Sequence, residues 1–299
     1  MDFEKVMGQL NIPGRKRVAV AAAEDDVVLK AVSDGHRRGL VEPLLCGDKA
    51  GIEKLARELD LDISKFEIIQ ASSPTEAARQ AVSLVREGKA DILMKGLIQT
   101  ADFLRAILDK EHGVRGKGIL SHCNIVHSPI LDRLILMTDA AMIPYPDLKT
   151  KVKIIENALI VARGVGMVNP RIAPLAAVEV VNPDMPATLD AAALTVMNQR
   201  GQIKGCVIDG PLAMDLALSE EAVHHKGLKS EVAGRADILL FHNIEAANNT
   251  MKALIYGGNC LAAGIVLGAA CPIVITSRSD SDQAKLYSIA CAAAITPSK

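Results

Sequence analysis

The chain has 299 residues, of which 49% are hydrophobic and 23% charged, a composition that excludes disorder as the main state and fits about two domains. Lysine and arginine (34) balance aspartate and glutamate (35), so the formal net charge is -1 and no overall field exists to hold nucleic acid or an anionic membrane. Aromatic residues make up only 2%, which removes most of the stacking platforms of a single-strand-binding protein.

The cysteines and the apolar segments indicate a cytoplasmic protein. The six cysteines are scattered without a Cys-x-x-Cys pair, which is typical of thiols in a reducing compartment. The first residues show no apolar core of a secretory signal. The longest apolar run, 260–275, contains glycine and proline and is shorter than the ~20 residues that span a bilayer. We therefore expect no membrane partner.

Short β-branched runs alternate with amphipathic helical patterns in the first third of the chain. The clearest helix start is the capping box Ser73-Pro74-Thr75-Glu76, with proline at the first helical position. Strand–helix alternation builds a parallel sheet with helices on both faces. The patterns predict strands at 17–21, 41–46, 66–70 and 91–94 and helices at 25–38, 49–58, 74–87 and 100–110.

The alternation resumes after the glycine-rich stretch 113–118. This break predicts an N-terminal α/β lobe over 1–115, with the C-terminal helix 281–299 packing back on it, and a second α/β lobe over 116–280. Two three-layer lobes with mostly parallel sheets leave an interlobe cleft, where such folds bind ligands. The patterns predict strands at 118–126, 134–138 (these two antiparallel), 175–181, 205–208, 236–241 and 272–276, and helices at 147–163, 186–200, 246–256 and 282–294.

The most informative segment is 272–282, where a strand runs into a helix. Backbone N–H groups of a helix start, hydroxyls and a guanidinium are the parts of an anion site. The alternative, that serine and aspartate only cap the last helix, does not require Arg278. The polar residues of the segment are Thr276, Ser277, Arg278, Ser279, Asp280, Ser281 and Asp282.

A second polar strand end follows residues 91–94. Gly96 allows a tight turn or the close approach of a ligand, and Thr100 can cap the next helix. Lys95 and Arg105 lie on either side of these two residues. An ordinary solvated lysine and a helix-surface arginine explain them equally well.

Two further positions follow strands in the second half. Asp209, in an Asp-Gly turn, either faces the cleft or belongs to a plain turn. Asn248, in an amide-rich segment, either donates to a ligand or helps to cap a helix. His122 and His127 lack the spacing of a zinc site and point to opposite faces of a strand, so no metal is expected. Dinucleotide, Walker and hydrolase motifs are absent.

Six segments from about residue 90 onward resemble the phosphate acetyl/butyryltransferase family, specifically its butyryl branch. The resemblance implies a reversible phosphotransacylase reaction, acyl-CoA plus phosphate giving acyl phosphate plus CoA, with coenzyme A as a substrate and no permanently bound cofactor. It also implies a fold like that of the isocitrate/isopropylmalate dehydrogenases and a homo-oligomer, at least a dimer. The segments are 93–105 (LMKGLIQTADFLR), 138–142 (TDAAM), 147–157 (DLKTKVKIIEN), 208–212 (IDGPL), 232–239 (VAGRADIL) and 275–281 (ITSRSDS).

The same resemblance implies roles for single residues. The family's Ser-Arg pair corresponds to Ser277 and Arg278, and a helical arginine corresponds to Arg105. The family's aspartate that assists thiol deprotonation corresponds to Ala284, so either a nearby carboxylate replaces it or no protein base is required. We expect Ser277, Arg278 and Arg105 to be catalytic, and Lys95, Gly96, Thr100, Thr276, Asp209, Asn248, Asp280 and Asp282 to bind substrate.

The expected activity is direct butyryl transfer in a ternary complex, in which Arg278 and Arg105 clamp phosphate and Ser277 bonds to the thiol or the oxyanion. One alternative is a phosphate acetyltransferase. Another is an NAD-dependent decarboxylating dehydrogenase on the same fold, although its metal-binding aspartates are not evident. A third is a non-catalytic acyl-CoA-binding protein, which Ala284 favours. The partners expected are small molecules. Apolar helices over 246–270 are a candidate interface between copies, although burial in the core explains them equally well.

Overall fold

The computed structural model describes residues 3–8, 10–12, 14–116, 118–278 and 280–297. The chain folds into two compact units. We call Asp2–Leu120 together with Ala263–Lys299 the terminal unit, and Ser121–Ala262 the central unit. Among the helices described, none is long and apolar enough to cross a membrane.

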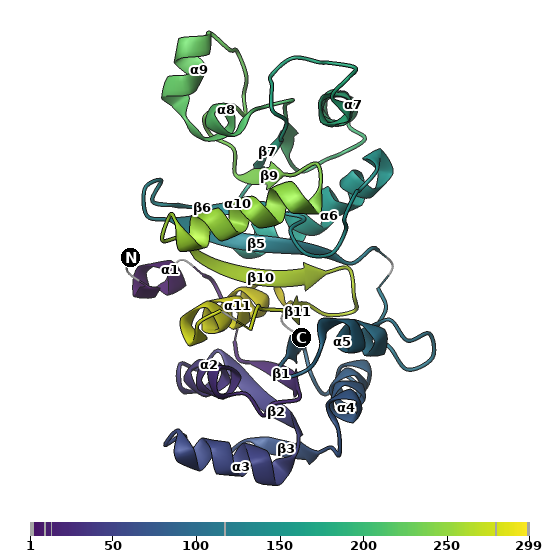
Figure 1. Ribbon diagram of the computed structural model, residues 1–299, viewed down its shortest axis with the longest axis vertical. Coiled ribbons are helices and arrows are strands. Elements are labelled where there is room, and N and C mark those ends of the chain that lie inside the picture. The colour runs from purple at the N-terminus through teal and green to yellow at the C-terminus, as the bar shows by residue number, and fades with distance from the viewer. Residues whose placement is uncertain (1–2, 9, 13, 117, 279, 298–299) are drawn as a thin grey trace. The chain divides into compact units, whose positions relative to one another are not determined.

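Six strands of the terminal unit form a sheet in the order β3-β2-β1-β4-β11-β10 (Figure 1). Neighbouring strands run parallel, except that β10 is antiparallel to β11. Pairing of β11 with β4 brings 263–280 into this unit, which differs from the boundary expected at residue 280. The strands are β1 (Lys16–Ala21), β2 (Val41–Gly47), β3 (Glu67–Gln70), β4 (Ile92–Lys95), β10 (Leu261–Leu267) and β11 (Ile273–Val274).

Helices cover both faces of this sheet. Figure 1 shows α2 and α11 on one side and α4 and α5 on the other. Residues 285–295 of α11 are all buried, and Leu286 and Ile289 lie against Gly35 of α2. The capping box at α4 is present in modified form, because Ser73 Oγ accepts from the N–H of Glu76 while the Glu76 carboxylate accepts from the N–H of Ser72. The helices are α1 (Phe3–Gly8), α2 (Asp26–Arg37), α3 (Lys49–Glu58), α4 (Pro74–Arg86), α5 (Thr100–Ile107) and α11 (Asp282–Ile295).

The central unit has strands in the order β5-β6-β9-β7-β8. The first two are antiparallel, as predicted, and the other neighbours are parallel. Its core includes Met137, Leu216, Leu239 and Phe241. The elements are β5 (Ser121–Ser128), β6 (Arg133–Thr138), β7 (Arg171–Pro174), β8 (Val207–Ile208), β9 (Ile238–Leu240), α6 (Leu148–Gly164), α7 (Pro186–Gln199), α8 (Met214–Leu218), α9 (Glu220–Lys226) and α10 (Ile244–Tyr256).

One predicted element of the second half is wrong, and one predicted interface is not helical throughout. The strand expected at 175–181 lies earlier, at 171–174, because its valines Val180 and Val181 are exposed and gain nothing from a buried sheet. The helix predicted at 246–256 is confirmed as α10, which ends at Tyr256 before Gly257 and Gly258. The rest of the apolar stretch expected to form helices up to residue 270 contains β10 instead.

Gly96 lies where the chain leaves β4. Its N–H donates to the carbonyl of Ala21 at 2.9 Å, and the N–H of Leu97 donates to that of Ala22 at 2.7 Å. A Cβ on Gly96 would lie 2.0 Å from the carbonyl oxygen of Ala22, so only glycine fits. The close approach expected at Gly96 is thus made by the protein's own backbone.

We expect Gly96→Ala to lower the free energy of unfolding by about 2–3 kcal/mol, because the added methyl group forces the ends of β1 and β4 apart. Urea denaturation measures the loss. Gly118→Ala is the matched control, since a Cβ there meets nothing within 4 Å. Equal unfolding midpoints for the two variants would contradict this packing.

Candidate active site

Three adjacent parallel strands, β1, β4 and β11, end at the same edge of the terminal unit's sheet. Lys95 is the last residue of β4, and its neighbour Met94 pairs with Val274 of β11. The loop 275–281 leaves β11 at this edge and leads into α11. The fold therefore brings the two polar strand ends of the sequence together, as parallel topology requires.

The loop is shaped by its own polar groups. The N–H of Ser277 donates to Asp280 Oδ2 at 2.7 Å, and the N–H of Asp280 donates back to the Ser277 carbonyl at 3.2 Å. Ser281 Oγ caps α11 by accepting from the N–H of Ala284 at 3.2 Å, and the Asp282 carboxylate accepts from the N–H of Gln283. Ser279 lies outside the described residues. Side chains of the loop thus take up backbone donors that the sequence assigned to an anion.

Lys285 is a residue of this site that the sequence analysis missed. It is 3% exposed, and its Nζ donates to Thr276 Oγ1 at 3.0 Å and to the Ser277 carbonyl at 2.9 Å. Helical side chains lean toward the N-terminus of their helix, which brings this ammonium under the loop. A signal was present, because Lys285 is the only charged residue in the apolar stretch 285–295.

Lys95 is also buried, with 6% of its surface exposed. Its Nζ donates only to the carbonyl of Gly96, at 3.3 Å, among the described residues. Burial lowers the pKa of Lys95, and the charges of Arg278 and Lys285 lower it further, while Asp25 opposes them. An ammonium with unused donors thus lies in a positive field.

Two further cations, Lys285 and Arg278, lie near Lys95. Burial lowers the pKa of Lys285 as well, against the opposing charges of Asp25, Asp280 and Asp26. Arg278 is exposed, and its guanidinium has no hydrogen bond or ion pair among the described residues. Such an arrangement can bind a multiply charged, oxygen-rich anion, because Lys95 and Arg278 both retain donors for it.

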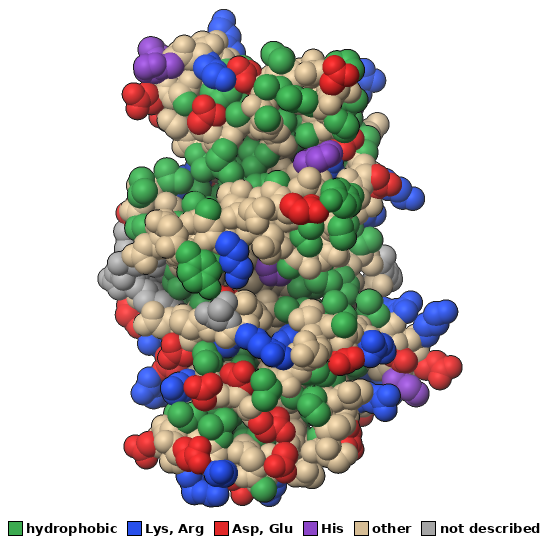
Figure 2. All heavy atoms as spheres, viewed as in Figure 1, with side chains coloured by type: hydrophobic (Ala, Val, Ile, Leu, Met, Phe, Trp, Pro, Cys, Tyr) green, Lys and Arg blue, Asp and Glu red, His purple; other side chains and the backbone are tan. Residues whose placement is uncertain are grey.

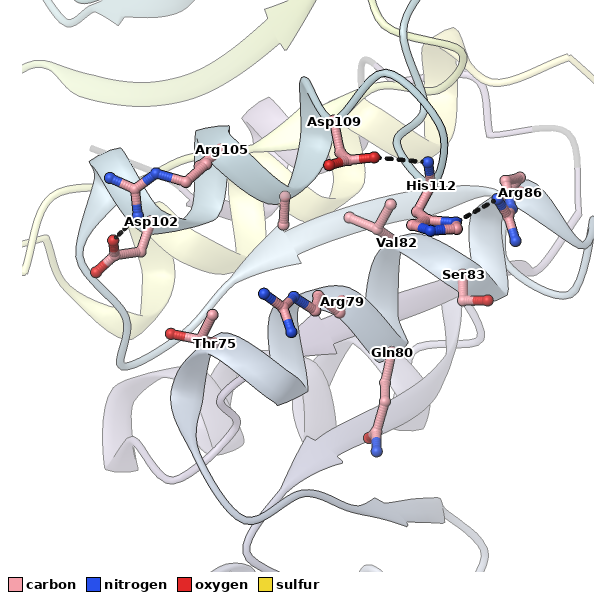
Figure 3. Close-up of a pocket in the computed structure, with 11 residues that line it drawn as sticks. Thr75, Arg79, Gln80, Val82, Ser83, Arg86, Asp102, Arg105, Asp109 and His112 are labelled. Carbon is pink, nitrogen blue, oxygen red and sulfur yellow. Dashed lines mark hydrogen bonds and ion pairs between the residues drawn. The ribbon is translucent and has the colours of Figure 1, made fainter.

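Arg105 lies in a different setting, a hollow of about 490 Å³ between α4 and α5 (Figure 3). Its side chain is 73% exposed and pairs with Asp102. Arg79 faces the same hollow from α4, and Arg86, bonded to the carbonyl of Glu111, lies at its far end. Arg105 is therefore not among the charges acting on Lys95.

Thr100 does not cap α5. The helix begins at Thr100 itself, and the N-cap is Gln99, whose side chain makes no capping bond. The Gln99 carbonyl instead accepts from the N–H groups of Asp102 and Phe103. The predicted capping role is wrong because the helix starts one residue earlier along the chain than that role requires.

Asp209 and Asn248 belong to the central unit. Asp209 follows β8 and lines a hollow with Lys229 and Glu231. Asn248, on α10, donates from Nδ2 to the carbonyl of Ala140 at 3.0 Å, and the N-cap of that helix is Asn243. Asn248 therefore ties α10 to Ala140, two residues beyond the end of β6.

A group of titratable side chains in the central unit was also missed. Lys151 of α6 is 2% exposed, and its Nζ lies 2.6 Å from Asp190 Oδ2 on α7 and 3.0 Å from His242 Nδ1 after β9. Burial and then the Lys151 charge lower the pKa of His242. Its neutral ring accepts at Nδ1, so the three residues join two helices to the end of a strand.

We expect Asp190→Asn to destabilise the protein by about 2–3 kcal/mol, because it leaves a buried ammonium without its carboxylate. Asp190 is itself 27% exposed at the side chain, which keeps the loss below that of a fully buried pair. The free energy of unfolding in urea measures it. Asp184→Asn, at an exposed position, is the control, and equal losses in the two variants would argue against the pair.

Charged side chains of both signs are interspersed on the visible face of the terminal unit (Figure 2), in agreement with a net charge of -1. The positive field at Lys95 is therefore local. It arises from the buried lysines and Arg278, and not from a basic surface.

Comparisons with known proteins place the whole chain among phosphate acyltransferases. A family model described as "Phosphate acetyl/butaryl transferase" matches residues 3–78 and 72–293. A phosphate butyryltransferase of Clostridium acetobutylicum is 47% identical over 99% of both chains, and a phosphate acetyltransferase of Thermotoga maritima is 43% identical over 98% of this chain and 99% of its own. The crystal structure of a branched-chain phosphotransacylase from Enterococcus faecalis superposes with a TM-score of 0.84 at 33% identity, covering 94% of this chain and 99% of that one.

Proposed function

This chain belongs to the phosphate acetyl/butyryltransferase family, and from that premise we propose that it transfers a short acyl group, with butyryl preferred, between coenzyme A and inorganic phosphate. The reaction is acyl-CoA plus phosphate giving acyl phosphate plus CoA. The identity to two phosphate butyryltransferases, 47% each, supports the butyryl preference over acetyl.

The observation that carries the proposal is a pair of cationic side chains, one beside and one within the loop 275–281, that still have hydrogen-bond donors available for a ligand. Lys95 is buried with one long hydrogen bond, and Arg278 has none among the described residues. Phosphate and acyl phosphate are dianions that offer several oxygens to such donors. We assign the phosphate group to Lys95 and Arg278, and the Ser277 hydroxyl to the thiol or to the oxyanion that forms at the acyl carbon.

In the direction of acyl-CoA synthesis, the CoA thiolate attacks the acyl carbon, the C–S bond forms, and the C–O bond to phosphate breaks with its electron pair on phosphate. Asp280 already accepts from the N–H of Ser277, and position 284 is alanine. We therefore assign the lowered pKa of the thiol to the neighbouring cations, as positive surroundings stabilise a thiolate. No acyl-enzyme forms, so sequential kinetics are expected.

The hollow between α4 and α5 suits the phosphate-rich part of coenzyme A. It is lined by Arg79, Arg86 and Arg105, and arginine is well matched to phosphate oxygens. Arg105 then binds coenzyme A, a different role from the phosphate clamp expected from the sequence.

We also propose that the protein acts in the cytoplasm as a homo-oligomer and has the isocitrate/isopropylmalate dehydrogenase-like architecture. Apolar side chains on the outer faces of α6 and α7, including Ile160, Leu189 and Val196, are 40–45% exposed and support association with a second copy. Light scattering of the purified protein gives the mass, and a monomer at all concentrations would oppose this part of the proposal.

The function is tested by mixing butyryl-CoA with phosphate and following thiol release with a chromogenic reagent. We expect phosphate-dependent release, faster with butyryl-CoA than with acetyl-CoA. Release without phosphate indicates a thioesterase, and binding of acyl-CoA without release indicates a non-catalytic protein. Either result would refute the proposed function.

We expect Arg278→Ala to lower kcat/KM for phosphate about 10²–10³-fold, because it removes a charged donor from the transition state. Steady-state thiol release at varied phosphate measures the change. Arg200→Ala, on the exposed end of α7, is the control and is expected to stay near wild type. An Arg278→Ala enzyme with unaltered kinetics would remove this assignment.

The lowered pKa of Lys95 predicts a pH dependence of phosphate binding. Only the ammonium attracts phosphate, so the phosphate KM rises as pH increases through the pKa of Lys95, below the ordinary lysine range. Arginine keeps its charge, so Lys95→Arg shows a smaller rise, and the part that remains comes from Lys285, whose pKa is also lowered by burial. Phosphate KM between about pH 7 and about pH 10 is compared in the two enzymes. Identical slopes would show that Lys95 is not the titrating ligand.

A further inference from the structure

Two buried lysines hold the two ends of α11. At its C-terminal end, Lys16 is 5% exposed and donates from Nζ to the carbonyl of Pro297 at 3.1 Å. At its N-terminal end, Lys285 is 3% exposed and donates to the loop that precedes the helix. The two residues are alike in burial and in binding a backbone carbonyl, but only Lys285 lies beside the candidate active site.

The contacts of Lys285 fix the residues that the proposed reaction uses. Its ammonium binds the hydroxyl of Thr276 and the carbonyl of Ser277, while Asp280 holds the N–H of the same serine. The peptide groups on both sides of the Ser277 Cα are therefore held, and the second of them also joins Ser277 to Arg278. The direction of both side chains depends on this backbone.

The hydrogen bonds that Lys285 makes to the loop do not require a charged donor. A hydroxyl and a carbonyl are satisfied by neutral donors, whereas a buried ammonium carries a desolvation cost. That cost is visible in the lowered pKa of Lys285, which Asp25, Asp280 and Asp26 oppose. In return, its charge adds to the positive field at Lys95.

We propose that Lys285 is a positioning residue for acyl transfer, whose buried ammonium orients Ser277 and Arg278 through the backbone between them and strengthens the field that holds phosphate. This inference rests on the proposed function and goes beyond it, because it assigns the loop's geometry to one buried cation on the helix behind it.

The test compares Lys285→Met with Lys16→Met. Both substitutions remove a buried ammonium that binds a segment flanking α11, Pro297 after the helix or the loop before it, so both lower the melting temperature. We expect only Lys285→Met to lower kcat, by about 100-fold, since a misplaced catalytic group loses about that much, while Lys16→Met stays within about threefold of wild type. Lys285→Arg, which restores charge and donors, is expected to recover at least tenfold over Lys285→Met.

Equal kcat losses in the two methionine variants, or a Lys285→Met enzyme within threefold of wild type, would overturn the proposal. If Lys285→Met does not fold, Lys285→Gln takes its place, keeping a neutral donor. We then expect a loss of at least tenfold, and wild-type kcat in this variant would equally overturn it.

A second readout separates this inference from the proposed function. Absence of thiol release in the wild-type protein would refute the function alone. Calorimetry with inorganic phosphate still tests Lys285, because the dissociation constant is expected to rise about tenfold or more in Lys285→Met and to be unchanged in Lys16→Met. Equal phosphate affinity in the wild type and Lys285→Met would refute the inference.

Discussion

Two ammonium groups with little exposure lie at one edge of a parallel sheet, and the rest of the site depends on them. The charges of Lys285 and Arg278 both repel the Lys95 ammonium, and burial weakens the solvation that would normally compensate. The Asp25 carboxylate favours the charged form of both lysines. A dianion bound among these cations would offset the cost of holding buried positive charges close together. The groups that destabilise the unliganded protein therefore favour the binding of phosphate.

The fold maintains this unfavourable arrangement through backbone contacts that leave little freedom. Gly96 lies against the carbonyl of Ala22, which fixes the end of β4 and with it Lys95. Pairing of β11 beside β4 fixes the start of the loop, and α11, which is buried from residue 285 to residue 295, fixes its end. Apolar packing and the close backbone contact at Gly96 therefore hold the cationic side chains in position. Sites that stabilise developing charge need groups that are preorganised in this way.

Much of this architecture is predictable from the sequence, because it depends on local signals. Hydrophobic periodicity places most strands and helices, and the serine caps at Ser73 and Ser281 give the starts of α4 and α11. The polar strand ends at Lys95 and at Ser277–Arg278 are visible as well. The identities to phosphate acyltransferases agree with the family that those segments resemble.

The features that could not be predicted from the sequence depend on tertiary contacts. Nothing in the periodicity distinguishes a buried lysine such as Lys151 from a solvated one, because burial is decided by the elements packed against it. Likewise, the apolar run 261–267 is compatible with helix or strand until β11 is available for pairing. The position of Arg105 in a separate hollow follows from how α4 packs on α5, which its own sequence context does not specify.

The most direct test is a crystal structure of the protein grown in inorganic phosphate. The account predicts a tetrahedral anion within hydrogen-bonding distance of Lys95 Nζ and the Arg278 guanidinium, beside the Ser277 hydroxyl. Phosphate absent from that position, with the guanidinium turned into solvent, would contradict it.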